Sequence, residues 1–449
     1  MGAYLPDDKD LLGEQDLLNN AVYQMERGAL VEFLARLHAL RSHGAFVELH
    51  KELLRHLRAR QILIGELRER QQERRETVAE LAAQRPKPVA LLRREDEHIK
   101  GEKALERVLL ALQSLVRSIA DGLAWYALEY DRRAVQVIGR GDRVAWLSDG
   151  PGLRAEIGVL QDAWERDLFA VLNDSTNCLR HGDVTAVSRA ARTIELYEVK
   201  AGDGANAGQS KRMEEVASVL NSGWHPTAGG GKPLQLVRVS QAYQTDLGIL
   251  PELFRRARDV GLAWAQTHSS VVVRVFDVSW AGNREALTGA EDEIRQAVSW
   301  YHTDGGTIEF LSAIRRMRDR RHSFSVLAPF SIFPVPVEDI ADLMLGNMEL
   351  ATIIHGPTLE AAFADAGMSA RVELGDDRFD SFVVVERNGE IIEIPATVRE
   401  QMFLELLTPA AVIAAADELL MDMAQHPSAA ENARMVTFAS ESAVWSPPL

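Results

Sequence analysis

Apolar residues recur every three or four positions through most of the first 130 residues, which is the spacing of one helix face. Residues 11–41 form a first run of this kind, and residues 95–130 form another with a leucine-rich stripe. Between them lies a seam with the 4-3 spacing of a coiled coil, made of Leu53, Leu57, Arg60, Ile64, Leu67, Gln71, Arg74, Val78 and Leu81. Its polar members shorten the coil, and Pro86 and Pro88 end the helix. We therefore predict two long helices packed as an antiparallel hairpin.

From about residue 150 the pattern changes to short apolar runs between small or charged residues, as expected for alternating helices and strands. The predicted elements of this middle region are a helix over residues 153–172, strands over 179–187 and 194–200, a helix over 209–221 and a strand over 234–240. A further short strand is predicted at 134–138, before a small-residue boundary at 149–152.

The remaining residues mix both periodicities. Strands are predicted at 271–277 and at 382–386, the latter paired with 391–394 through a turn at 387–390, and helices at 290–301, 361–366 and 409–423. The tail from residue 424 is expected to be poorly ordered. Because 449 residues are too many for one compact core, we predict a multidomain α/β protein. Its parts are a helical domain over residues 1–150, an α/β core over 151–245 and an α+β domain over 246–449.

The hydrophobic content of 46% and charged content of 26% are ordinary for a soluble globular protein. The net charge of −16 is unevenly spread, because from Glu338 onward 20 acidic residues stand against 5 arginines and no lysine, a net charge of −15. The rest of the chain is therefore near neutral. Since acidic surface repels phosphates, we expect nucleic acid to bind the body of the chain. The acidic quarter after residue 337 is expected to restrain that binding or to dock a partner.

A single cysteine, Cys178, excludes an intrachain disulfide and a cysteine zinc cluster. No apolar stretch approaches a membrane span by inspection, and the N-terminus lacks a signal-peptide pattern. We therefore expect a cytoplasmic protein that does not engage a membrane. The run Gly229-Gly230-Gly231-Lys232 is not a phosphate loop, because Pro226 and Pro233 stand where glycine and a hydroxyl residue are needed. An ATPase is excluded on that ground.

The most informative charges lie at the ends of the two middle strands. A tight turn over residues 189–192 would place Asp183 opposite Glu198, with their Cβ atoms roughly 5 Å apart. Glu198 and Lys200 are two residues apart and so project from the same face of their strand. Because charge is costly to bury in a sheet without a partner, the three side chains are interpreted as a site for a divalent cation and a water. The alternative is an exposed ion-pair cluster on a hairpin edge.

Asp183 with Glu198-Val199-Lys200 resembles the motif of the PD-(D/E)xK nuclease superfamily, with Glu198-Val199-Lys200 as the E-x-K element. The order helix, strands, helix, strand over residues 150–242 is similar to the αβββαβ core of that family. Two features depart from the family pattern. Gly182 rather than proline precedes Asp183, and no first strand is evident between Leu172 and Leu179.

The resemblance implies that Mg²⁺, with Mn²⁺ as a substitute, is held by Asp183, Glu198 and the Val199 carbonyl, and that Lys200 orients or deprotonates a water. A fourth acid would come from the preceding helix. Glu165 is favoured over Glu156, and because the two are nine apart on opposite helix faces, at most one serves.

Three groups of residues are candidates for phosphate contacts. Gln209 occupies a position that is often catalytic in the family, and Lys211 lies close by at the same helix start; an ordinary polar first turn is the alternative. Five arginines lie within residues 315–321, and of these Arg315, Arg316 and Arg318 are the candidates for nucleic-acid binding. A solvated helix face paired with the acidic quarter would explain the same run.

The resulting hypothesis is a Mg²⁺-dependent nuclease that hydrolyses phosphodiester bonds of DNA, with RNA not excluded, in restriction, repair or bacterial anti-phage defence. The alternative is a non-catalytic interaction or scaffold protein. The helices of residues 46–130 are expected to drive homo-oligomerisation or contact with a partner protein, since their apolar stripes exceed what one helix pair hides.

Overall fold

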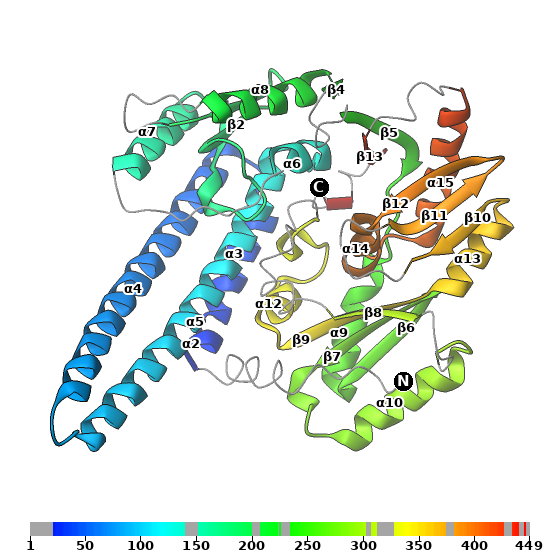
Figure 1. Cartoon of the computed structure of the whole chain (residues 1–449). Helices are drawn as coiled ribbons and strands as arrows, with labels where there is room; N and C mark the ends of the chain where they lie inside the picture. The colour runs from blue at the N-terminus through cyan, green and yellow to red at the C-terminus, as the bar shows by residue number, and fades with distance from the viewer. Residues whose placement is uncertain are drawn as a thin grey trace.

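A computed structural model describes residues 21–139, 151–199, 207–222, 224–225, 234–301, 307–311, 327–373, 381–425, 433–439 and 444–445. Helices fill the first part of the chain, and helices alternate with short strands in the rest (Figure 1). Within the described residues the strands form four small sheets, three of them antiparallel and one mixed. The chain is thus a mixture of helix and sheet, in accord with a multidomain α/β protein in general.

The predicted helical hairpin is confirmed. After α2 (Ala21–Met25) and α3 (Arg27–His38), the two long helices α4 (His43–Ala83) and α5 (Val89–Ala127) run antiparallel and project from the body (Figure 1). Ser42 caps α4 by accepting a hydrogen bond from the Ala45 N–H. The apolar seam residues from Leu53 to Leu67 are buried, and Val78 and Leu81 are partly exposed, so the chain hides most of this stripe itself.

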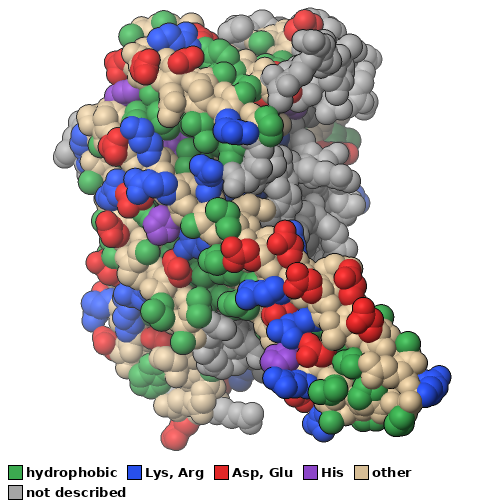
Figure 2. All heavy atoms as spheres, turned by 90° about the vertical axis from the view of Figure 1, so that its left-hand side faces the viewer, with side chains coloured by type: hydrophobic (Ala, Val, Ile, Leu, Met, Phe, Trp, Pro, Cys, Tyr) green, Lys and Arg blue, Asp and Glu red, His purple; other side chains and the backbone are tan. Residues whose placement is uncertain are grey.

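The polar seam positions have partners on α5 or at the start of α3. Arg60 pairs with Glu26 at 2.5 Å, and Gln71 donates to Glu106 at 2.9 Å. Seen from the hairpin side, acidic and basic side chains of the described residues are intermingled, with apolar ones between them (Figure 2). The coil is therefore held by polar contacts where the leucines are missing, which explains how arginines occupy seam positions.

Helix α5 corrects one expectation. Its length and an 18-residue window of mean hydropathy 1.3 are those of a membrane span, so an apolar stretch of that length does exist. In this structure 78% of the window is buried inside the protein, where it packs against α3 and α4. A buried core helix passes the same test of length and composition, so the helix is compatible with a soluble protein.

The predicted strand at 134–138 is wrong, because these residues lie in helix α6 (Arg132–Ile138). Asp131 caps α6 by accepting a hydrogen bond from the Arg133 N–H at 2.9 Å. Six of its seven residues are buried, and Arg133 is partly exposed. An apolar run this short lacks the periodicity that separates a buried strand from a buried helix.

The middle region begins with α7 (Pro151–Glu165), which is shorter than the predicted helix. After a turn at Asp167, whose φ is +60°, the chain enters β1 (Phe169–Leu172). The strand that the sequence did not reveal is therefore the end of the run interpreted as helix. It pairs with β2 (Val184–Ser188), which pairs in turn with β3 (Thr193–Tyr197).

The register predicted for the second hairpin is confirmed over the five pairs from Val184↔Tyr197 to Ser188↔Thr193. The predicted helix and strand that follow are also present, as α8 (Ala207–Ser222) and β5 (Leu234–Ala242). However, β5 does not join the sheet of β1–β3. It lies between β4 (Trp224–His225) and β13 (Ala433–Ala439), and it pairs with β13 in parallel.

The strand β13 also shows that the expectation of a poorly ordered tail is wrong for these residues. Farther along, Trp445 is only 2% exposed, and its ring lies 6.4 Å from that of Trp125 on α5. The tail is held because its apolar residues complete a core that other parts of the chain leave open.

The C-terminal region contains a second, four-stranded sheet of order β6-β7-β9-β8. Its elements are α9 (Leu250–Val260), β6 (Leu262–His268), β7 (Val271–Asp277), α10 (Arg284–Ala297), β8 (Thr307–Leu311), α12 (Val337–Leu345) and β9 (Met348–His355). The acidic quarter is thus interleaved with earlier residues, since β9 is paired on both sides.

A third antiparallel sheet follows. Its elements are α13 (Gly356–Asp365), β10 (Ser369–Val372), β11 (Ser381–Arg387), β12 (Glu390–Pro395), α14 (Ala396–Leu404) and α15 (Pro409–Gln425). The predicted hairpin of β11 and β12 is confirmed. Asn388 and Gly389 form its turn with φ of +55° and +86°, the backbone that a two-residue turn requires.

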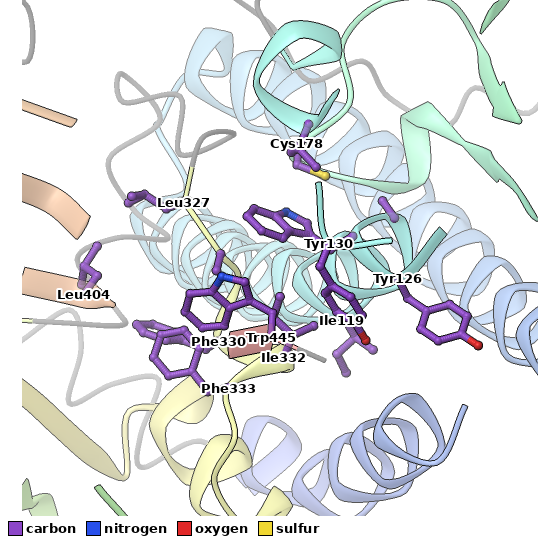
Figure 3. Packing of buried hydrophobic residues seen from close by; sticks show 14 of the residues in the cluster. Ile119, Tyr126, Tyr130, Cys178, Leu327, Phe330, Ile332, Phe333, Leu404 and Trp445 are labelled. Atoms are coloured by element: carbon purple, nitrogen blue, oxygen red, sulfur yellow. The ribbon is translucent and has the colours of Figure 1, made fainter. Parts of the chain in front are cut away.

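One apolar cluster connects all these parts. Ile119 and Tyr130 of the helical region meet Phe330, Phe333 and Trp445 of the C-terminal region (Figure 3). Burial of this surface is the main favourable contribution to folding here. The domain boundaries near residues 150 and 245 stay predictions, because the cluster runs across both positions.

Candidate functional site

Asp183 and Glu198 lie one residue beyond the last ladder pair of β2 and β3. The Asp183 N–H donates to the Tyr197 carbonyl at 2.7 Å, and the Val199 N–H donates to Asp183 Oδ2 at 2.5 Å. The carboxylate of Asp183 is therefore held against the backbone of the Glu198-Val199 segment. Its other oxygen, Oδ1, accepts no hydrogen bond from the residues that the structure describes.

Gly182 explains the departure from the family pattern before Asp183. Its φ is +73°, and a Cβ at this position would lie 2.8 Å from the Tyr197 carbonyl oxygen. Proline cannot adopt this φ, because its ring fixes φ near −65°. The backbone before Asp183 therefore has a conformation that proline cannot adopt, and glycine allows the close contact with the Tyr197 carbonyl.

Asn173 orders the segment that leads to Asp183. Its side-chain amide donates to the carbonyls of His181 at 2.7 Å and Gly182 at 3.0 Å. Its backbone N–H donates to the Asp183 carbonyl at 2.8 Å. The Thr185 hydroxyl donates to Asn173 Oδ1 at 2.8 Å. Every polar group of this buried side chain is thus used to hold the backbone around Asp183.

The long helix α5 and the short helix α6 support the same segment. Asp121 of α5 accepts hydrogen bonds from the N–H groups of Asn177 at 2.5 Å and Cys178 at 3.0 Å. The Ile138 carbonyl at the end of α6 accepts from the N–H groups of Arg180 at 3.1 Å and His181 at 3.2 Å. The candidate site is therefore positioned by helices from outside the middle region.

Carboxylates gather around Asp183. Burial raises the pKa of Glu156 to about 7, and the charges of Asp183, Asp174 and Glu198 add to the rise. Burial likewise raises the pKa of Asp174 to about 6, opposed by Arg117 and reinforced by Asp183. The pKa of Asp183 is raised by burial, and the hydrogen bond from Val199 opposes that rise. Each of these acids therefore resists ionisation more than it would in water.

The structure favours Glu156 over Glu165 as the helix acid, contrary to the sequence-based choice. Glu165 is exposed at the last residue of α7, about 13 Å along the axis from Glu156. Glu156 is half-buried and close enough to Asp183 and Glu198 for their charges to act on it. Because α7 ends before β1, Glu165 stands at the exposed end of the helix, and its role as the helix acid stays a prediction.

Two arginines lie among these acids. Burial lowers the pKa of Arg117 on α5 to about 10, although Asp174 and Asp121 oppose the fall. Burial also lowers the pKa of Arg180, with Asp121 and Asp174 acting in the opposite direction. Both residues were missed in the sequence, since nothing in the local pattern of α5 shows that Arg117 approaches a loop near residue 174.

The donor set agrees in its chemistry with a hard divalent cation. Half-buried carboxylates that raise one another's pKa would be relieved of repulsion by a positive ion. Among the described residues, however, no group of three or more His, Cys, Asp or Glu side chains is arranged to hold a metal. Mg²⁺ commonly uses only one or two carboxylates and keeps several waters, so Asp183, Glu198 and the Val199 carbonyl would have to suffice.

The remaining predicted residues lie wholly or partly outside the part of the chain that the structure describes. Lys200 and the arginines Arg315, Arg316 and Arg318 lie outside the described residues. Gln209 and Lys211 belong to the beginning of α8, of which only the backbone is described. Compared with protein-family models, with curated proteins and with solved structures, the chain has no significant match.

Proposed function

We propose that the chain is a metal-dependent nuclease of the PD-(D/E)xK type that hydrolyses phosphodiester bonds, with DNA as the first candidate substrate. The observation that carries the proposal is the position of Asp183 and Glu198 at the end of one hairpin, with Asp183 bound to the Val199 N–H. The order α7-β1-β2-β3-α8-β4-β5 supports the αβββαβ assignment, although the short β4 is additional and both β4 and β5 belong to another sheet.

Each residue has a distinct task in this proposal. Mg²⁺ or Mn²⁺, when bound, would polarise the phosphate and acidify a water. Asp183 keeps one oxygen on the Val199 N–H, which fixes its orientation, and offers the other to the cation together with Glu198 and the Val199 carbonyl. Glu156, with a pKa of about 7, is able to hold or release a proton near neutral pH. Lys200 orients the attacking water, and Gln209, Lys211 and the arginines of the 315–321 run contact the phosphate backbone.

The test is cleavage of labelled DNA and RNA by the purified protein with Mg²⁺, with Mn²⁺ and with EDTA. Asp183→Asn, Glu198→Gln and Lys200→Ala should each abolish cleavage with the fold intact, and Glu156→Gln should reduce it. Glu165→Gln is the matched control on the same helix and should cleave normally. Full activity in both Glu198→Gln and Lys200→Ala would remove the assignment.

A non-catalytic interaction protein is the second candidate, favoured by the lack of a three-ligand group among the described residues. Titration calorimetry with Mn²⁺ separates the two. Binding that disappears in Asp183→Asn supports the nuclease, whereas no binding at millimolar Mn²⁺ supports the interaction protein. A cytoplasmic role in restriction, repair or anti-phage defence is the context that we propose for the nuclease.

We also propose the α4–α5 hairpin as the contact for a second copy or a partner protein. Because the seam is largely buried within the chain, this proposal rests on the projecting hairpin (Figure 1). It rests also on the exposed side chains of Ile62, Leu63, Val89 and Leu91. Sedimentation velocity of the whole protein and of a variant with Ile62→Ser and Leu63→Ser tests this contact. An unchanged sedimentation coefficient, with a monomer in both cases and no partner bound, would refute it.

A further inference from the structure

A cavity of about 250 Å³ lies between the edge strand β3 and helix α8. Its described lining is Ile194, Leu196, Met213, Glu214, Ala217 and Leu220. Five of these side chains are apolar, and Glu214 supplies the one charged group. The cavity is smaller than the pockets that enclose drug-sized ligands, and it is much larger than one water molecule. Its size and lining therefore suit a single flat ring.

The cavity exists because α8 uses another face for packing. Among the residues of α8 whose burial is described, Val216 and Val219 are buried, and the helix packs against α6. Met213, Ala217 and Leu220 recur at the spacing of a separate helix face and line the cavity opposite β3. The apolar surfaces of β3 and α8 thus face each other without direct packing, which leaves room for a ligand between them.

The cavity adjoins the candidate site along one strand. Ile194, Leu196 and Glu198 alternate along the chain, so they project from the same face of β3 and its continuation. Leu196 and Glu198 are about 7 Å apart along such a strand. A strand of nucleic acid whose phosphate reaches Glu198 would therefore bring a neighbouring base to the cavity.

We propose that the cavity receives one unpaired base of the nucleic acid, next to the phosphodiester that the site cleaves. This inference rests on the proposed nuclease function and specifies its substrate as single-stranded or locally unpaired. The apolar walls would cover the faces of the base, and the Met213 sulfur is a favourable neighbour for an aromatic ring. A base within a duplex cannot enter, because its faces are stacked and its edge is paired.

Glu214 gives the cavity a base preference. An ionised carboxylate only accepts hydrogen bonds, so it pairs with the exocyclic amino group of cytosine and opposes the carbonyl edge of thymine. Glutamine, in contrast, both donates and accepts, so it can pair with cytosine or with thymine. Because the cavity suits a single ring, cytosine is therefore the expected occupant, and Glu214→Gln should remove the discrimination against thymine.

The test is equilibrium binding of fluorescent oligothymidylates in EDTA, so that no metal or cleavage is involved. Probes carry one central cytosine, adenine, thymine or abasic site, and a duplex of the same sequence is included. The cytosine probe should bind about tenfold more tightly than the thymine and abasic probes. Ala217→Phe, which fills the cavity, should abolish the difference, and Glu214→Gln should bring the affinities for the cytosine and thymine probes together.

Glu215→Gln is the control, because Glu215 is the next residue on α8 and does not line the cavity. Circular dichroism melting of each variant verifies its fold. Equal binding of all four probes by the unaltered protein overturns the inference, as does an unchanged cytosine preference in both Ala217→Phe and Glu214→Gln. Base-selective binding without metal-dependent cleavage of any nucleic acid would retain the cavity as a base site and reject the nuclease.

Discussion

Glu405 and Asp183 are both carboxylates withdrawn from water, but their surroundings are opposite in kind. Glu405 is 0% exposed and accepts hydrogen bonds from Arg132 at 3.0 and 2.5 Å, from the Ala328 N–H at 2.7 Å and from the Tyr243 hydroxyl. Asp183 accepts one backbone N–H and stands close to another acid, Glu156, whose pKa its charge helps to raise. One acid is surrounded by donors, and the other belongs to a group of like charges.

The difference indicates what each group is for. A buried charge with all its lone pairs satisfied serves architecture, and Glu405 joins the helical region to the C-terminal region through Arg132 of α6. The Arg132 guanidinium also lies 5.1 Å from the Trp125 ring centre and 5.3 Å from that of Tyr243. Acids that raise one another's pKa reduce stability, and such groups are concentrated at functional sites. The comparison thus assigns a structural role to Glu405 and a chemical one to Asp183.

The largest effect should come from removing Glu405. Glu405→Ala leaves Arg132 charged and buried without its carboxylate, so we expect a loss of about 3–5 kcal/mol in the free energy of unfolding. Urea denaturation followed by tryptophan fluorescence measures it, with the exposed Glu165→Ala as a control expected to change by less than about 0.5 kcal/mol. A loss below about 1 kcal/mol for Glu405→Ala would contradict the structural role.

Replacing Glu156 with glutamine should have a smaller effect of opposite sign, an increase in the free energy of unfolding above neutral pH. Its pKa rises from 4.5 in the unfolded chain to about 7 in the fold, so the folded state holds the proton more tightly. The free energy of unfolding should therefore fall as the pH rises from about 4.5 to about 7, and Glu156→Gln should remove that fall. Because the side chain is only half-buried, solvent screening limits the gain of the variant at pH 8 to about 1 kcal/mol.

Denaturant titrations at pH 5 and pH 8 measure this difference. Glu156→Gln should equal the unaltered protein at pH 5 and exceed it at pH 8, whereas Glu165→Gln should match it at both. If Mg²⁺ binds beside Asp183, saturating Mg²⁺ should reduce the pH dependence of the unaltered protein, since the cation compensates the acids. Identical pH dependence in Glu156→Gln and the unaltered protein would remove Glu156 from the carboxylate group.

These residues also show which features the sequence can predict. The register of β2 and β3 followed from a tight turn and the alternation of the strands, both of which are local. The end of α7 did not, because Ala170, Val171 and Leu172 suit a buried helix as well as a strand. The partners of Glu405 and of the loop after β1 could not be predicted, since Arg132 and Asp121 are brought there only by tertiary packing.

The smallest effect should come from an ion pair of ordinary geometry whose arginine is exposed to solvent. Arg68 and Glu106 meet across the hairpin at 2.8 Å, with side chains 50% and 17% exposed. Water and salt screen such a pair, so Arg68→Gln should cost less than about 1 kcal/mol, and the cost should shrink in 1 M NaCl, where the Debye length is about 3 Å. The loss in Glu405→Ala should not change with salt, because no ions reach that site. Urea denaturation of both variants at 0.05 and 1 M NaCl measures the two salt dependences side by side. If Arg68→Gln lowers the free energy of unfolding as much as Glu405→Ala does, and still does so in 1 M NaCl, then burial is not what separates the structural acids of this chain from the others.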